Sequence, residues 1–184
     1  MVLDHSPANL ERQLTLMAED IKERVLRYLN DAYAVEEGAI SALTDLSTDA
    51  HHPDVRAAAS EHLEQTKLHA SRINARIVAL GGDASHGKSL VNKVIAMGSD
   101  LLNIFHDAED KQTQDVIKAY ALENFEVAMY TALKSYADAV GDYETAQLAD
   151  SLISEEQLAA ERMLRIVPAV AVTAVAKTAH TNPV

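Results

Sequence analysis

Residues 116–137 read VIKAYALENFEVAMYTALKSYA, and this stretch decides the fold. Small and apolar residues recur in it at alternating steps of four and three, which is the spacing of one face of an α-helix. We call the face of a helix that shows this spacing its core-facing stripe. In residues 116–137 it carries Ala119, Glu123, Glu126, Tyr130, Leu133 and Ala137. Two carboxylates therefore stand where a bundle helix normally carries leucine or isoleucine. A buried carboxylate is costly unless it is paired or bound to a metal, so the stretch predicts one of these partners.

The composition of the whole chain agrees with a helical protein. The chain has 184 residues, 48% of them hydrophobic, with only six glycines and four prolines. Its length suits one substantial core and is short for two. The sequence therefore predicts an all-α fold and one domain over residues 1–184.

Charge and cysteine content limit the function. The chain has no cysteine, which excludes disulfides, zinc–thiolate sites and thiol catalysis, so any metal must have oxygen and nitrogen ligands. The net charge of −12 argues against binding to nucleic acid or to anionic membranes. No apolar run approaches the ~18 residues of a membrane span, and no secretory signal is apparent at the N-terminus. We expect a cytoplasmic protein without membrane or nucleic-acid partners.

The first predicted helix is longer than a compact bundle needs. Ser6 and Pro7 form a helix start, and apolar residues then follow the three-four rhythm to about residue 47, with Glu36 on the core-facing stripe. Such a helix would be about 60 Å long. It should either break near residues 20–24 or extend as an arm, over about residues 7–25, that meets another subunit. We expect a homodimer, because the arm carries an apolar line formed by Leu10, Leu14, Met17 and Ile21.

The second predicted helix runs from Pro53 to about Leu80, before two glycines. His62 and His69 lie on its core-facing stripe, with Gln65 beside them. A weaker apolar pattern over residues 88–106 predicts a connecting helix that carries the chain back along the bundle.

The last long helix is predicted from Tyr143 to about Ile166, with Glu156 facing the core and Glu155 facing solvent. Beyond Pro168 the extension over residues 168–184 alternates alanine and valine. Periodicity over so few residues is compatible with either a short helix or an extended segment.

Each of the four long helices places a potential metal ligand near its middle. This arrangement is typical of diiron and dimanganese carboxylate bundles, in which oxygen ligands and one or two imidazoles hold two divalent ions. A single core-facing glutamate is more often a partly exposed or hydrogen-bonded group, but candidate ligands at such positions on all four helices favour a metal site. The candidate ligands are Glu36, His62, Gln65, His69, Glu123, Glu126 and Glu156. Tyr33 and Tyr130 lie one turn from candidates and could act in the reaction by hydrogen-bonding them, or could be ordinary core tyrosines.

Four motifs give the chain a resemblance to a known family. They are DAYAVEE around Glu36, EHLEQT around Gln65, ENFEVAMY around Glu126 and SEEQLAAE around Glu156. In order and spacing they resemble the ferritin-like stress proteins of the YciF type, within the rubrerythrin-like part of that superfamily, over about residues 26–166. The resemblance implies a ferritin-like four-helix bundle with a long crossover, and a diiron site whose carboxylate ligands are Glu36, Glu123, Glu126 and Glu156.

Two positions depart from the family pattern. Gln65 stands where the family usually has a glutamate, and Ala160 stands where it usually has aspartate or histidine. An amide is a poorer ligand than a carboxylate, and alanine is none. Either His62 or His69 could supply a nitrogen ligand instead. The site is thus expected to be asymmetric, to hold one metal, or to be vestigial.

The predicted function is that of a dinuclear iron or manganese protein, with two iron ions per chain or manganese in their place. It would react with dioxygen or peroxide, either to oxidise iron or to remove peroxide under stress. The chain lacks the cysteines of the rubredoxin-type module that rubrerythrins use. The alternative is a metal-free bundle with a structural or protein-binding role, which Gln65 and Ala160 would favour.

Overall fold

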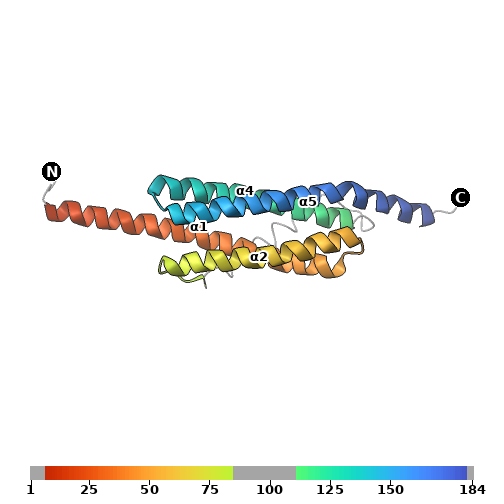
Figure 1. Cartoon of the computed structure of the whole chain (residues 1–184), viewed down its shortest axis with the longest axis horizontal. Coiled ribbons are helices and arrows are strands. Elements are labelled where there is room, and N and C mark those ends of the chain that lie inside the picture. Colours follow the sequence, from red (N-terminus) through yellow and green to blue (C-terminus); the bar gives the residue numbers. More distant parts are fainter. Residues whose placement is uncertain (1–6, 85–110, 182–184) are drawn as a thin grey trace.

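The computed structural model describes residues 7–84 and 111–181, which form four helices (Figure 1). They are α1 (Pro7–Asp49), α2 (Pro53–Ala79), α4 (Lys111–Val140) and α5 (Tyr143–Thr181). The described residues contain no β-strand, and the all-α prediction is confirmed. None of the described helices combines the length and apolarity needed to cross a membrane. The predicted helix over residues 88–106 lies outside the described residues.

Short turns set the ends of the helices. Pro53 opens α2, and the ring nitrogen Nδ1 of His52 accepts a hydrogen bond from the backbone N–H of Asp54. Gly81 and Gly141 follow α2 and α4 with φ angles of +72° and +77°. Only glycine adopts this left-handed conformation without strain, so these two residues end the helices where the sequence predicts.

The helices pack as two hairpins. α1 lies along α2, α4 lies along α5, and the hairpins meet through α1 with α4 and α2 with α5. Two apolar clusters fill the interior. The first contains Val25, Leu29, Ala32, Ile73, Ile77, Tyr130, Leu133, Ala149 and Leu152. The second contains Leu43, Ala50, Val55, Ala59, Val116, Ala119, Met163 and Val170. In every helix, the candidate metal ligands fall between the residues of these two clusters.

Two helices extend beyond the rest of the bundle, at opposite ends (Figure 1). α1 is continuous, without a break at residues 20–24, and its N-terminal part projects as an arm past α2, α4 and α5. The prediction that the last helix ends near Ile166 is wrong, because α5 continues through Pro168 to Thr181. Pro168 lies on the exposed side, while Val170 is buried in the second cluster. Proline removes one backbone hydrogen bond of the helix, and the packing of Val170 offsets this loss, so the helix continues past Pro168.

Candidate metal centre

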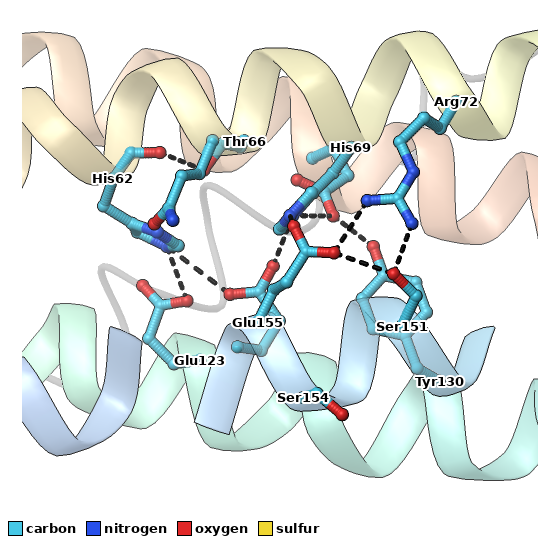
Figure 2. A network of polar contacts seen from close by, with 12 residues as sticks. His62, Thr66, His69, Arg72, Glu123, Tyr130, Ser151, Ser154 and Glu155 are labelled. Atoms are coloured by element: carbon cyan, nitrogen blue, oxygen red, sulfur yellow. Dashed lines mark hydrogen bonds and ion pairs between the residues drawn. The ribbon is translucent and has the colours of Figure 1, made fainter. Parts of the chain in front are cut away.

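Six candidate ligands meet at one level of the bundle, between the two apolar clusters. Figure 2 shows His62 and His69 pointing from α2 towards α4 and α5, where Glu123 and Tyr130 of α4 and Glu155 of α5 are labelled. The side chains of all six candidates are buried. They are Glu36, His62, His69, Glu123, Glu126 and Glu156.

The first ligand group consists of His62, Glu123, Glu126 and Glu156. Each contributes one ligand atom, and these atoms all lie within 4.8 Å of one another. His62 Nε2 is 2.8 Å from Glu123 Oε2 and 3.5 Å from Glu156 Oε2. Three carboxylates and one imidazole are a ligand set that suits iron or manganese.

The second ligand group consists of Glu36, His69 and Glu156, with the same limit of 4.8 Å between ligand atoms. His69 Nδ1 is 2.6 Å from Glu156 Oε1 and 3.6 Å from Glu36 Oε1. The Tyr130 hydroxyl donates a hydrogen bond to Glu36 Oε1. Glu156 belongs to both groups, with Oε2 towards His62 and Oε1 towards His69. Glu156 could therefore offer one oxygen to an ion in each group.

Many polar atoms of the cluster have no hydrogen-bond partner, although they are buried. Both oxygens of Glu126 receive no hydrogen bond from a nitrogen or hydroxyl donor. One oxygen each of Glu36 and Glu123 also lacks a hydrogen bond, as does Nδ1 of His62. Buried polar atoms are rarely left unpaired, so they call for a partner of another kind. Four ionised carboxylates balance the charge of two divalent ions, so these residues fit a dinuclear site.

Without a metal, burial and crowding keep part of the cluster protonated. Burial, reinforced by the nearby charges of Glu36 and Glu123, raises the pKa of Glu126 well above its ordinary value. Burial raises the pKa of Glu123 to about 7, against the effect of His62. Burial also opposes ionisation of Glu156, but its contacts, first with His69, hold its pKa below the ordinary value. A metal ion has to displace the protons on Glu123 and Glu126.

Glu155 holds His69 in place from outside the cluster, and the prediction that it faces solvent is wrong. His69 Nε2 lies 2.9 Å from Glu155 Oε2, and Arg72 and Ser151 each donate to Glu155 Oε1 at 2.8 Å (Figure 2). These hydrogen bonds, led by that of Arg72, outweigh burial and lower the pKa of Glu155 to about 2. An anion at Nε2 keeps the proton on that nitrogen and turns Nδ1 towards the cluster.

Two predicted site residues are not among the six buried candidates. Gln65 is half-buried, accepts a hydrogen bond from Arg162 at 3.1 Å, and is hydrogen-bonded to His62 of the first ligand group. Tyr33 is half-buried and hydrogen-bonded to Glu37, on the same side of α1. Gln65 therefore borders the cluster through His62, whereas Tyr33 interacts with a residue outside it.

Replacing Glu155 with alanine is expected to weaken one of two metal-binding events by about 10- to 100-fold, because His69 loses the group that orients it. Glu155→Gln should retain more of the affinity, since the amide oxygen can still accept the hydrogen bond. Ser154→Ala is the matched control, because Ser154 is exposed, points away from the cluster and bonds only its own helix (Figure 2). Anaerobic titration with Mn(II) measures the effect. Equal affinities in Glu155→Ala and Ser154→Ala would contradict this role.

Comparisons with known proteins agree with the helical-bundle fold. The family model described as Domain of unknown function (DUF892) matches residues 20–176. The stress protein YciF of E. coli is similar in structure, with a TM-score of 0.68, 17% identity, and coverage of 82% of this chain and 96% of that one. A dodecameric thioferritin, the bacterioferritin-related protein of Bacteroides fragilis, gives a TM-score of 0.62 at 20% identity, covering 83% and 89%. YcfI of Rhodopseudomonas palustris, whose description suggests a structural role, gives 0.66 at 21% identity, covering 78% and 92%. At these identities the three structures show a shared ferritin-like fold.

Proposed function

The chain belongs to the DUF892 family, and we propose that it binds two divalent ions, iron or manganese, and reacts with dioxygen or peroxide. One observation carries the proposal. Glu156 is buried and shared by the two ligand groups, with Oε2 3.5 Å from His62 Nε2 and Oε1 2.6 Å from His69 Nδ1. A bridging position between two ions gives both oxygens a partner and explains why the carboxylate is buried.

The chain's own residues would hold the ions and keep the site dry. Glu123, Glu126 and His62 would bind one ion, and Glu36 and His69 would bind the other. Tyr130 steadies Glu36, and burial raises the pKa of this phenol well above its ordinary value, so it stays a neutral donor. The apolar clusters on both sides exclude water. Bound iron or manganese supplies the electrons with which dioxygen or peroxide is reduced.

Two of the named relatives support this proposal. YciF is called a stress protein, and the Bacteroides fragilis protein is called a thioferritin. A ferritin-like stress protein with a carboxylate cluster suits iron oxidation or peroxide removal. The second of these relatives is dodecameric, which supports self-association of this chain as well.

The proposed reaction is tested by adding peroxide to protein loaded with Fe(II) under anaerobic conditions. Two Fe(II) ions reduce one hydrogen peroxide to two waters, taking up two protons. The wild-type chain should oxidise its iron faster than free Fe(II) in the same buffer. The Glu36→Ala, Glu126→Ala double variant, which lacks a ligand of each group, should not. Equal rates for the wild type, the variant and free iron would overturn the proposal.

A metal-free structural role is the second candidate. It is favoured by the description of YcfI and by the close pairs His62–Glu123 and His69–Glu156, at 2.8 and 2.6 Å. Protonated histidines in these pairs would neutralise part of the cluster's charge. They leave Glu126 with only another carboxyl group, that of Glu123, within hydrogen-bonding reach, which is why we favour the metal site.

A further inference from the structure

The N-terminal arm, defined as residues 7–24, carries exposed apolar side chains. Among the residues of α1 whose burial the structure describes, Val25 is the first buried one, and every residue from Leu10 to Asp20 is exposed. Leu14 and Met17 are 59% and 60% exposed. Most helical stability in proteins comes from packing of an apolar face, so an arm in this conformation calls for packing.

The apolar residues of the arm are spaced symmetrically. Leu10, Leu14, Met17 and Ile21 follow one another in steps of four, three and four. Read from either end the spacing is the same, so two antiparallel copies can pair in register. In this register Leu14 faces Met17 of the second copy, and Leu10 faces Ile21. The centre of symmetry falls between residues 15 and 16, which is also the middle of the arm.

A groove lies at the base of the arm, next to the place that the N-terminal end of a second copy's arm would reach. Its volume is about 270 Å³, and it is lined by Ala18, Ile21, Val25, Leu80 and Val140, together with Gly141 and the charged residues Lys22, Arg76 and Asp142. Because Leu10 of the second copy faces Ile21, its side chain arrives beside this groove. The apolar line of the arm is thus continuous with the apolar part of a groove at the end of the bundle.

Charge also favours a second copy as the occupant. The whole chain carries a net charge of −12, whereas the arm has three basic and four acidic residues. Two copies therefore meet with little repulsion at their arms and with strong repulsion elsewhere. The same excess of negative charge opposes docking of the arm on an anionic lipid surface.

We propose that the arm pairs with the arm of a second copy, antiparallel about a two-fold axis between residues 15 and 16, so that Leu10 of each chain seats at the other's groove. The interface is isologous and closes at two chains. Each bundle lies at the far end of the other chain's arm, which gives an elongated dimer. The proposal is independent of the metal site, whose ligands all lie beyond the arm.

Light scattering coupled to gel filtration tests the interface. The wild type should have twice the chain mass of 20.0 kDa, and Leu14→Asp, Met17→Asp should have the mass of one chain. Leu16→Asp is the matched control, because Leu16 is 52% exposed but about 100° from Met17 around the helix, and it should remain dimeric. Circular dichroism of all three proteins confirms that they are folded.

Engineered cysteines test the direction of pairing, since the chain has no cysteine of its own. When Leu14→Cys and Met17→Cys proteins are mixed and oxidised, the antiparallel register predicts mainly the mixed cross-linked dimer. Each variant alone should cross-link slowly.

Four results would overturn the proposal. They are a monomeric wild type, a dimeric Leu14→Asp, Met17→Asp variant, loss of the dimer in Leu16→Asp, and rapid cross-linking of Leu14→Cys with itself, which would indicate parallel arms. A monomer that binds vesicles of phosphatidylcholine and phosphatidylserine would assign the arm to a lipid surface instead.

Discussion

Replacing Glu156 with alanine is expected to abolish binding of both metal ions, reducing the stoichiometry from two per chain to none. Glu156 supplies one oxygen to each ligand group, so its loss removes a ligand from both and also removes the bridge. Glu36→Ala should have a smaller effect, since Glu36 belongs to the second group alone. This variant should still bind one ion, held by His62, Glu123, Glu126 and Glu156. Anaerobic titration with Mn(II), followed by its electron paramagnetic resonance signal, distinguishes these outcomes.

The matched control for this prediction is Glu161→Ala. Glu161 lies on the same helix as Glu156 but is exposed, with an ion pair to Arg165 at 3.3 Å. This variant should bind two ions, like the wild type. If Glu156→Ala also bound two ions with unchanged affinity, Glu156 would not be the bridging ligand.

Replacing Glu126 with glutamine is expected to stabilise the metal-free protein and to weaken metal binding. Burial raises the pKa of Glu126, so the carboxyl keeps its proton to a higher pH in the folded chain than in the unfolded chain, where the ordinary value is 4.5. A raised folded-state pKa means that the stability this group contributes is present at low pH and is lost as the pH rises above 4.5 towards the folded-state value. Glutamine cannot ionise, so the variant does not lose stability in this way as the pH rises.

Urea unfolding of the metal-free proteins at pH 7 and pH 5 measures this difference. Glu126→Gln should be more stable than the wild type at pH 7, and the difference should be smaller at pH 5. Glu161→Gln, at an exposed position, should change stability little at either pH. A Glu126→Gln variant that is several kcal/mol less stable than the wild type would show that the carboxylate is instead a well-paired structural group.

The sequence predicts the level of the cluster because each helix carries its own signal. A charged residue on the apolar stripe of a helix is visible from periodicity alone, which is why Glu36, Glu123 and Glu156 were identifiable. His62 and His69 are seven residues apart and therefore share one face of α2. The four helices place these residues at one level because a short turn joins the two helices of each hairpin and so fixes their alignment.

The residues that support the cluster could not be predicted in the same way. Glu155 is one step from Glu156, which places it at the boundary between α5 and α2, and a single-helix pattern cannot tell that boundary from the solvent face. Its partner Arg72 lies on the other helix, so the pair is visible only once the helices are docked. Continuation of α5 through Pro168 likewise depends on a tertiary contact, the packing of Val170.

The most direct test of the dinuclear site is an anaerobic titration of the full-length, metal-free protein with Fe(II) or Mn(II). We predict two ions bound per chain, together with an unfolding temperature that rises with the concentration of the metal. Binding no stronger than that of the Glu36→Ala, Glu126→Ala double variant, with no change in unfolding temperature, would contradict the account.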